Sequence, residues 1–456
     1  MKILFTKYIM KKKFSVLINN KINKINKKII VESDKSISHR ALLISSQCIG
    51  VSCLTNILES EDVNNTVTCL KKLGVKILKK NEKYIVYGNG LSSFKSPKKN
   101  SLYTGNSGTL ARMLFPLLGT QSNLKVKLIG DESLNKRDMK RIIEPLSKIG
   151  CTFLPYKKNT LPLTIKGTGM PLAQKHIETI GSAQVKSAIL LAALNTPGVT
   201  EIYSEKISRD HTENLLFAIG ANIKVRKVKN GNLISLKGQK NLFSFNLSIP
   251  GDPSSAAPFI ILTLLTNKSK LIIKNINCNP TRIGFIKILK KMNANIKIVN
   301  VKKKFNEPVG DIVVKSSKLK PINCPKNLVP SSIDEFPLLF ITSSILKGVS
   351  KFTGIKELRH KESDRIKSIE VILNKIGIKT KSSLDSFTIF GNPDIKIKKK
   401  IKVTPKNDHR VAMASFCLGQ LIGGEIIIND FQTVNTSFSQ FLSIMKKIGA
   451  KYEIKK

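Results

Sequence analysis

Six stretches of the chain share one pattern of apolar and polar positions. In each, two apolar residues three positions apart are followed by a turn residue and then by alternating apolar and polar positions. The stretches are LKKLGVKI (70–77), LSKIGCTF (146–153), LFAIGANI (216–223), LKKMNANI (289–296), LNKIGIKT (373–380) and MKKIGAKY (445–452). The pattern indicates an amphipathic helix that ends where a short strand begins.

The turn position of each stretch holds Gly or Asn. By subtraction of residue numbers, the intervals are 76, 70, 73, 84 and 72 residues between Gly74, Gly150, Gly220, Asn293, Gly377 and Gly449. Both residue types adopt the left-handed backbone conformation that often ends a helix. Repetition at a nearly constant interval predicts six copies of one α/β unit. A chain of 456 residues is long for one domain, so we expect two domains of three repeats each.

Each repeat also starts with a polar cluster that runs into an apolar helix. The clusters are DKSISHRALLISS from 34, GNSGTLARMLFPLL from 105, GSAQVKSAILLAAL from 181, GDPSSAAPFIILTLL from 251, SIDEFPLLFITSS from 332 and NDHRVAMASFCLG from 407. Ser, Asp, Asn and Gly are typical residues at helix N-termini. The free N–H groups of such termini bind anions.

Basic residues recur where the second helix of a repeat begins. They include Lys136, Arg137, Arg209, Arg282, Lys361 and Arg365. Any one of them alone would be a solvated surface residue, but their recurrence predicts a ligand with phosphate and carboxylate groups. If two threefold units face each other, the cations pooled in one cleft are Lys35, Arg40, Arg112, Arg137, Arg365 and Arg410.

Acidic residues are fewer at these positions. Asp334 and Glu335 open the fifth apolar helix, and Glu362 and Asp364 are expected in the second helix of that repeat. Each is either an ion-pair partner of the cations or a general base or acid. The chain has no nucleophile elbow, Walker loop, HExxH or dinucleotide fingerprint. Catalysis by positioning, charge and proton transfer is what remains.

The formal net charge of +48 would suit nucleic acid, an anionic membrane or acidic small molecules. The Lys excess extends over all repeats together with Ile and Asn, which favours a bias of composition. The seven cysteines form no CxxC pair and no zinc spacing, which suits a reducing compartment such as the cytoplasm. No apolar run reaches the roughly 18 residues of a membrane span. Residues 1–31 carry nine Lys and no acid; we interpret them as an irregular start and a first strand, with Met10 as an alternative initiator.

Nine strings in order resemble the EPSP synthases, the 3-phosphoshikimate 1-carboxyvinyltransferases of the enolpyruvyl transferase family. They are DKSISHRA, GNSGT followed by Arg, GDESLNKR, SAQVKSA, GDPSSAA, EPVGDI, IDEFP, ELRHKESDR and DHRVAM. The resemblance extends from about residue 29 to the end, and SAQVKSA and IDEFP are closest to the second class of the family.

The resemblance implies an α/β fold, a two-domain inside-out α/β barrel built from six βαβαββ repeats, three per domain. The first domain would be 34–250, and the second would be 1–33 together with 251–456. The hinge crossings are expected near 33–35 and 250–252.

The resemblance also implies the site residues. Shikimate 3-phosphate would be bound by Lys35, Ser36, Arg40, Ser182, Ala183, Gln184, Arg209, Asp334 and Lys361. Phosphoenolpyruvate would be bound by Lys35, Asn106, Gly108, Arg137, Gln184, Arg365 and Arg410. The catalytic residues would be Lys35, Asp334 and Glu362.

In the family reaction, Asp334 would take the proton of the 5-hydroxyl of shikimate 3-phosphate as it attacks C2 of phosphoenolpyruvate. Glu362 would protonate the methylene carbon, and loss of phosphate from the tetrahedral intermediate would give the enol ether. No metal and no organic cofactor are implied. The resemblance implies small-molecule substrates, with no nucleic acid and no membrane as partners, and a monomer.

Three departures from the family pattern occur, and one of them is a pair of residues. Glu32-Ser33 replaces a common Pro-Gly and adds an acid beside the hinge, which is expected to weaken anion binding. Asp138 replaces a common Pro and is able to pair with Arg137, and Asn435 replaces a Lys. At Gly108, bulkier residues are associated with glyphosate tolerance in the family, so Gly predicts a sensitive enzyme.

Three alternatives stay open. The sister enolpyruvyl transferase acting on UDP-N-acetylglucosamine has a similar architecture but relies on a reactive loop Cys. A nucleic-acid-binding protein would suit the charge, although an aromatic content of 6% with no Trp argues against base stacking. A non-catalytic homologue is the third, and the retention of Lys35, Asp334, Glu362, Arg365 and Arg410 argues against it.

Overall fold

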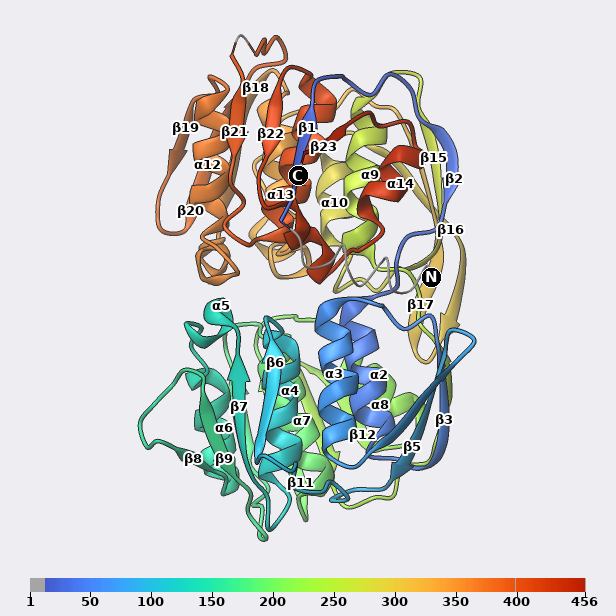
Figure 1. Ribbon diagram of the computed structural model, residues 1–456, viewed down its shortest axis with the longest axis vertical. Coiled ribbons are helices and arrows are strands. Elements are labelled where there is room, and N and C mark those ends of the chain that lie inside the picture. The colour runs from blue at the N-terminus through green and yellow to red at the C-terminus, as the bar shows by residue number, and fades with distance from the viewer. Residues whose placement is uncertain (1–12, 398, 456) are drawn as a thin grey trace. The chain divides into compact units, whose positions relative to one another are not determined.

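A computed structural model describes residues 13–397 and 399–455; the alternative initiator Met10 lies outside these residues. The contacts between residues divide the chain into two compact units (Figure 1). Unit 1 contains the described residues of Met1–Glu32, Gly251–Lys302 and Pro308–Lys456. Unit 2 contains Ser33–Pro250 and Lys303–Glu307.

Six small sheets share one pattern of strand pairing, in which a parallel pair is followed by antiparallel neighbours. The sheets of unit 2 have the orders β14-β3-β5-β4, β6-β7-β9-β8 and β10-β11-β13-β12. Those of unit 1 have the orders β16-β17-β15-β2, β18-β20-β19 and β21-β22-β1-β23. Among the described residues, the three-stranded sheet lacks the first, parallel strand of the other five sheets. At the corresponding position, Asn323 forms a single parallel β-bridge with Lys351.

The strands of unit 2 are β3 (Ile49–Thr55), β4 (Lys76–Lys80), β5 (Lys83–Asn89), β6 (Ser101–Gly105), β7 (Lys125–Gly130), β8 (Thr152–Leu154), β9 (Leu163–Lys166), β10 (Lys175–Glu178), β11 (Val199–Ser204), β12 (Asn222–Val228), β13 (Gly231–Lys237) and β14 (Asn246–Ser248). The strands assigned mainly to unit 1 are β1 (Ser15–Ile18), β2 (Asn26–Ile29), β15 (Lys270–Asn277), β16 (Asn295–Lys304), β17 (Glu307–Lys315), β18 (Gly348–Thr353), β19 (Thr380–Ser382), β20 (Ser386–Gly391), β21 (Ile401–Val403), β22 (Ile426–Ile428) and β23 (Glu453–Lys455).

The helices of unit 2 are α2 (Lys35–Ser45), α3 (Glu61–Lys72), α4 (Gly108–Gly119), α5 (Glu132–Asn135), α6 (Lys140–Ile149), α7 (Ala183–Asn195) and α8 (His211–Ala218). Those of unit 1 are α9 (Pro253–Leu265), α10 (Gly284–Lys291), α11 (Phe336–Ser344), α12 (Arg365–Lys375), α13 (His409–Ile422) and α14 (Phe441–Lys447), with the 3₁₀ helices η1 (Lys326–Leu328), η2 (Pro330–Ser332), η3 (Lys356–His360) and η4 (Phe431–Thr436).

The order of these elements follows the βαβαββ pattern, and some repeats complete their sheet with a strand from elsewhere in the chain. In unit 2, β14 pairs with β3 of the first repeat. In unit 1, β1 pairs with β22 and β23 of the last repeat, and β2 pairs with β15. The N-terminal segment therefore holds two strands, where the sequence indicated one. The predicted α/β fold is confirmed, and the structure contains six small sheets within the described residues.

All six predicted turn residues adopt the left-handed backbone conformation. Their φ angles are 90° at Gly74, 112° at Gly150, 82° at Gly220, 73° at Asn293, 83° at Gly377 and 102° at Gly449. In each case the preceding helix ends within one or two residues of the turn. The prediction of six equivalent helix ends is therefore confirmed, with Asn in the one copy that lacks Gly.

The six apolar helices at the front of the repeats form the centres of the two cores. In unit 1, α9, α11 and α13 pack on one another, and in unit 2, α4 packs on α2 and α7. Five of the six begin with a side-chain cap from Asp34, Ser107, Ser182, Asp252 or Asp408. The exception is α11, whose N-cap residue Glu335 makes no capping hydrogen bond.

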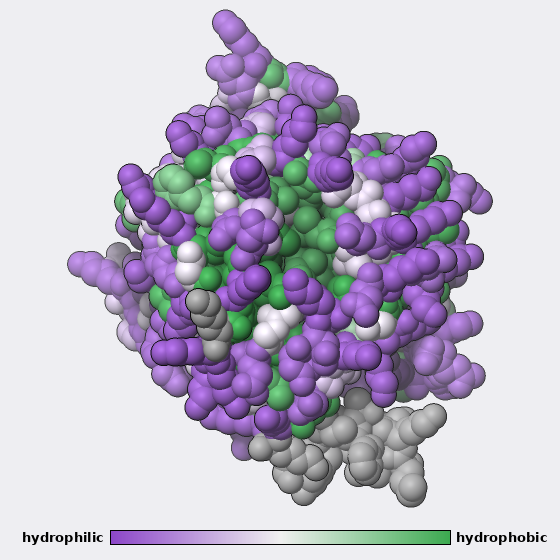
Figure 2. All heavy atoms as spheres, turned by 90° about the horizontal axis from the view of Figure 1, so that it is seen from above, coloured by the Kyte–Doolittle hydropathy of each residue, from purple (hydrophilic) through white to green (hydrophobic). Residues whose placement is uncertain are grey.

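The face of the molecule drawn in Figure 2 is largely polar. Figure 2 shows hydrophilic side chains over most of one face, with smaller apolar areas between them. Among the described residues, no helix is both long and apolar enough to span a membrane.

Candidate functional site

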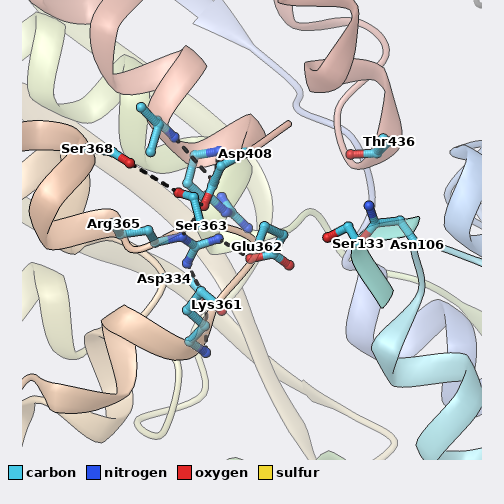
Figure 3. Close-up of polar contacts among 12 residues, drawn as sticks. Asn106, Ser133, Asp334, Lys361, Glu362, Ser363, Arg365, Ser368, Asp408 and Thr436 are labelled. Carbon is cyan, nitrogen blue, oxygen red and sulfur yellow. Dashed lines mark hydrogen bonds and ion pairs between the residues drawn. The ribbon is translucent and has the colours of Figure 1, made fainter. Parts of the chain in front are cut away.

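The guanidinium of Arg365 is the centre of a cluster of charged residues in unit 1 (Figure 3). Its Nε donates to Asp408 Oδ2 over 2.9 Å, and its Nη2 donates to Glu362 Oε2 over 2.7 Å. Its Nη1 lies 3.3 Å from Asp334 Oδ1. One buried cation therefore contacts both predicted catalytic acids.

Helix starts place these side chains. Arg365 is the first residue of α12, directly after the N-cap Asp364, whose carboxylate accepts from Lys367 N. The prediction that Glu362 and Asp364 lie within this helix is wrong, because the side chain of Asp364 caps the helix and so ends it on that side. Asp408 caps α13 by accepting from the backbone of Arg410 over 2.9 Å. Its other carboxylate oxygen remains for Arg365 and for the hydroxyl of Ser363, 3.1 Å away. A single acid thus fixes the ends of two helices relative to each other.

The carboxylate of Asp334 lies among three cations. Besides Arg365, Lys361 Nζ lies 3.7 Å from Oδ1, and Arg282 Nη1 lies 3.9 Å from Oδ2. The Asp334 side chain is 17% exposed, whereas those of Arg282 and Arg365 are 2% exposed. Neighbouring cations favour the charged form of a carboxylate, which is the form a general base needs.

Burial and the neighbouring carboxylates act in opposite directions on Arg365. Burial alone would lower the pKa of its guanidinium, but the charges of Asp408, Glu362 and Asp334 outweigh burial and raise the pKa. The Arg365 side chain is therefore a permanent positive charge in this cluster.

In unit 2, the starts of α4 and α7 bring four predicted residues together. Arg137 Nη2 donates to Asn106 Oδ1, and the amide of Asn106 donates to Asp131 over 2.8 Å. Gln184 accepts from Arg112 Nη1 over 2.8 Å. A Cβ at Gly108 would lie 2.8 Å from Arg112 Nη1 and 3.4 Å from Arg137 Nη1. The predicted phosphoenolpyruvate residues Asn106, Gly108, Arg137 and Gln184 thus surround one helix start, with Arg112 among them.

Arg40 is held by three hydrogen bonds in unit 2. Nε donates to Thr212 Oγ1 over 2.8 Å, Nη2 to Ser187 Oγ over 2.8 Å, and Nη1 to the backbone oxygen of Ser36 over 3.0 Å. Burial lowers the pKa of Arg40 to about 10, partly opposed by the charges of Glu213 and Asp34. Arg40 is therefore still charged at neutral pH, and α7 and α8 fix its orientation.

The remaining predicted residues of unit 2 lie at helix starts. Lys35 is the first residue of α2, and its Nζ lies 3.0 Å from Asp62 Oδ2. Ser182 caps α7 and Ala183 is its first residue. The backbone N–H of Ser182 donates to Glu178 Oε1 over 2.9 Å, so Glu178 holds the loop before the helix. Arg209 lies two residues before α8.

Several residues that contact the predicted site side chains were not predicted from the sequence to be site residues. Asp408 and Arg282 contact the predicted catalytic cluster, and Ser187 and Thr212 hold Arg40. The sequence contained a clue for Asp408, which lies at the start of a front helix, and for Arg282, which is a basic residue near the start of a second helix. It contained no clue for Ser187 and Thr212.

One group of metal-ligating side chains occurs among the described residues. The ligand atoms of Asp210, His211 and Glu307 in unit 2 all lie within 4.8 Å of one another. His211 Nδ1 lies 2.8 Å from Glu307 Oε1, and Asn214 donates to the same oxygen over 3.1 Å. Hydrogen bonds among the side chains account for this arrangement.

The sequence profile of EPSP synthase (3-phosphoshikimate 1-carboxyvinyltransferase) matches residues 19–445. The chain belongs to the EPSP synthase family. It is 43% identical over 429 residues to 3-phosphoshikimate 1-carboxyvinyltransferase of Petrotoga mobilis, covering 93% of this chain and 97% of the relative. It is 38% identical over 443 residues to that of Zymomonas mobilis, covering 96% and 97%. A solved EPSP synthase from Acinetobacter baumannii matches with a TM-score of 0.84 and 35% identity, covering 97% of this chain and all of the other.

Two departures from the EPSP synthase pattern have structural explanations. Glu32, where Pro is common, turns its carboxylate towards the start of α14. Its Oε1 accepts from Ser439 Oγ over 2.6 Å and from Gln440 N over 3.2 Å. Asp138, also in place of Pro, accepts from Lys140 N over 2.7 Å and so supports the start of α6.

Proposed function

We propose that this protein transfers the carboxyvinyl group of phosphoenolpyruvate to the 5-hydroxyl of shikimate 3-phosphate and releases phosphate. The observation that supports this best is the contact of one buried cation, Arg365, with both Asp334 and Glu362. Addition followed by elimination needs a base and an acid that act on the same pair of substrates.

We assign the residues as follows. The shikimate 3-phosphate set is Lys35, Ser36, Arg40, Ser182, Ala183, Gln184, Arg209, Asp334 and Lys361, and the phosphoenolpyruvate set is Lys35, Asn106, Gly108, Arg137, Gln184, Arg365 and Arg410. The starts of α2, α4 and α7 support the anion-binding roles, because helix N-termini and guanidinium groups both favour phosphate and carboxylate.

In the addition step, Asp334 accepts the proton of the 5-hydroxyl while the hydroxyl oxygen forms a bond to C2 of phosphoenolpyruvate. Glu362 gives a proton to C3, which becomes a methyl group. In the elimination step, C3 returns a proton to Glu362 as the C2–O bond to phosphate breaks, and Asp334 returns its proton to the leaving phosphate. The net reaction consumes both substrates and gives the enol ether and phosphate.

The contact of Glu362 with Arg365 explains how its protonation would depend on substrate. In the structure described here, Arg365 donates to Glu362 over 2.7 Å, which favours the carboxylate. An anionic substrate bound to Arg365 competes for the same N–H groups. Glu362 then loses part of this stabilisation, which favours its protonated form.

We also propose that this chain forms two domains, 34–250 and 1–33 together with 251–456, as expected for the family. Each domain is an inside-out α/β barrel, and the hinges lie near 33–35 and 250–252. Hydrogen bonds at the boundaries support this. Asp34 N donates to Pro250 O over 2.8 Å within unit 2, and Asp252 N donates to Glu32 O over 2.9 Å within unit 1. The two segments in which the chain passes between the units are thus joined by one backbone hydrogen bond within each unit.

We further propose that the protein acts as a monomer in the cytoplasm, without metal or cofactor.

The cysteines of this chain do not favour the sister reaction with UDP-N-acetylglucosamine, which relies on a reactive loop Cys. Six of the seven cysteines are buried, and Cys53 is half-buried within β3. Burial raises the pKa of Cys48, Cys69 and Cys151 to about 12 and that of Cys278 and Cys324 to about 11, and it also raises the pKa of Cys417. Thiols of this kind are inert.

The deciding experiment measures phosphate release by the purified protein with phosphoenolpyruvate and shikimate 3-phosphate together, and with each omitted. Release only with both supports the proposal. Release with UDP-N-acetylglucosamine in place of shikimate 3-phosphate would assign the sister reaction instead. Release with neither acceptor would leave the proposed activity without support.

A further inference from the structure

Glu335 is a buried acid beside the proposed base Asp334. It directly precedes α11 and is 1% exposed. Its Oε1 accepts a hydrogen bond from Ser254 Oγ, whereas its Oε2 is buried without a hydrogen-bond partner. Among the described residues, it forms no ion pair. The sequence placed Glu335 at the start of the fifth front helix, but the reaction assigned to the site does not use it.

These surroundings favour an uncharged Glu335. An ionised carboxylate with one hydroxyl donor and no ion-pair partner is unfavourable in a protein interior. Burial raises the pKa of Glu335; the charge of Asp334 raises it further, while Arg282, Arg410 and Ser254 oppose the rise without cancelling it. The geometry and the pKa direction therefore agree on a carboxylic acid.

Ser254 connects Glu335 to the residues around Asp334. Its hydroxyl donates to Glu335 and accepts from Arg282 Nη2 over 3.0 Å. Arg282 also donates to Asp252 Oδ1 over 2.7 Å, and its Nη1 lies 3.9 Å from Asp334 Oδ2. The backbone oxygen of Ser254 accepts from Arg410 over 3.3 Å. The position of one serine therefore affects two guanidinium groups of the site.

We propose that Glu335 is a positioning residue for the reaction: as an uncharged acid it fixes Ser254, and through Ser254 it fixes Arg282 beside Asp334. The absence of charge matters as much as the hydrogen bond. An ionised Glu335 would compete with Asp334 for Arg282, whereas an uncharged one leaves this cation to the base. The inference rests on the proposed function for its consequence in catalysis, but not for the protonation of Glu335.

The protonation is tested without any substrate. The infrared spectrum of the wild-type protein at pH 7 is compared with that of Glu335→Gln, in the region of the carbonyl stretch of a protonated carboxyl group. A band present in the wild type and absent from the variant is expected. If the two spectra are the same in this region, the proposal is wrong, whatever the activity of the protein.

The positioning role is tested by steady-state kinetics of phosphate release. Glu335→Gln keeps a neutral acceptor for Ser254, so its kcat should stay within about threefold of the wild type, whereas Glu335→Ala should lose about tenfold or more in kcat. KM for shikimate 3-phosphate should change less than kcat in both. Equal losses in the Gln and Ala variants, or a wild-type kcat in the Ala variant, would overturn the proposal.

Two serine variants separate positioning from loss of folding. Ser254→Ala removes the link while leaving Glu335 in place, and it should lower kcat as Glu335→Ala does. Ser344→Ala is the control, because Ser344 is also buried but donates only to Ile341 O within α11, over 2.8 Å. A wild-type kcat for Ser254→Ala contradicts the role of the link. An inactive wild type would refute the proposed function, while the infrared result would still decide the state of Glu335.

Discussion

The Nε of Arg365 donates to Oδ2 of Asp408 over 2.9 Å, and these side chains are 2% and 0% exposed. Such a pair adds little net stability by itself, because both charges lose their hydration. Removal of one partner is different, since it leaves the other as an uncompensated buried charge.

We therefore expect Asp408→Ala to reduce the free energy of unfolding by about 3–5 kcal/mol, in part because the cap of α13 is lost as well. Urea unfolding of the two proteins measures this. The control is Glu425→Ala, which removes the partner of Lys400 in a pair whose side chains are 43% and 51% exposed. This exposed pair should contribute at most about 1 kcal/mol, and a similar loss in both variants would show that burial is not the cause.

Asp334→Asn and Glu362→Gln should each lower kcat by about a hundredfold or more while substrate binding remains largely intact, because each removes a general acid or base. Turnover and substrate binding are measured separately. Glu370→Gln is the matched control: Glu370 lies in α12, the helix that begins with Arg365, but pairs with the exposed Lys367. Near-normal turnover in either of the first two variants would remove its assigned role.

Arg137→Ala should raise KM for phosphoenolpyruvate more than KM for shikimate 3-phosphate, because Arg137 contacts Asn106 at the start of α4. The adjacent Lys136 gives the control, since its ion pair with Glu132 is exposed, with side chains 73% and 88% accessible. Lys136→Ala should leave both constants unchanged. Equal rises in the two constants for Arg137→Ala would argue against a site for one substrate.

We expect glyphosate to inhibit the wild-type protein in competition with phosphoenolpyruvate, because position 108 holds Gly. In Gly108→Ala, the new Cβ would approach Arg112 Nη1 to 2.8 Å and Arg137 Nη1 to 3.4 Å, so both glyphosate and phosphoenolpyruvate should bind more weakly. Titration of glyphosate at fixed phosphoenolpyruvate measures both effects. The absence of inhibition at millimolar glyphosate in the wild type would contradict this expectation.

Glu335 should make stability depend on pH. Its pKa is raised in the folded protein, whereas an unfolded Glu titrates near about 4.3. Between these two values the folded state binds more protons, so the contribution of Glu335 to stability falls as pH rises through this window. Glu335→Gln does not titrate, so its stability relative to the wild type should increase with pH from about 4 upward. A difference that does not change with pH would contradict the raised pKa.

The features that the sequence predicted well depend on neighbouring residues. The six left-handed turns follow from Gly or Asn after an amphipathic helix, and five front helices have the caps that Ser and Asp indicate. Such patterns occupy only a few residues, and the repeat supplies six independent examples of each. The fold class and the six equivalent helix ends were therefore predictable.

The contacts that hold the site were not predictable in the same way. Arg365 and Asp408 are 43 positions apart, and Arg40 is 147 positions from Ser187 and 172 from Thr212. No periodicity connects such pairs, because they depend on how different repeats pack. The buried state of Glu335 has the same origin, since Ser254 and Arg282 belong to another repeat.

Helix α11 lacks the side-chain cap that begins the other five front helices. In the other five copies, the leading Ser or Asp side chain bonds to its own helix, an interaction typically worth about 1 kcal/mol. In this copy, the N-cap residue Glu335 accepts from Ser254 instead, and the neighbouring Asp334 contacts Arg365, Lys361 and Arg282. The carboxylate of Glu335 thus contacts another repeat rather than the backbone of its own helix. The acids at this one helix start connect the fifth repeat to Ser254 and Arg282 of the fourth, so a local cap has been exchanged for contacts between repeats.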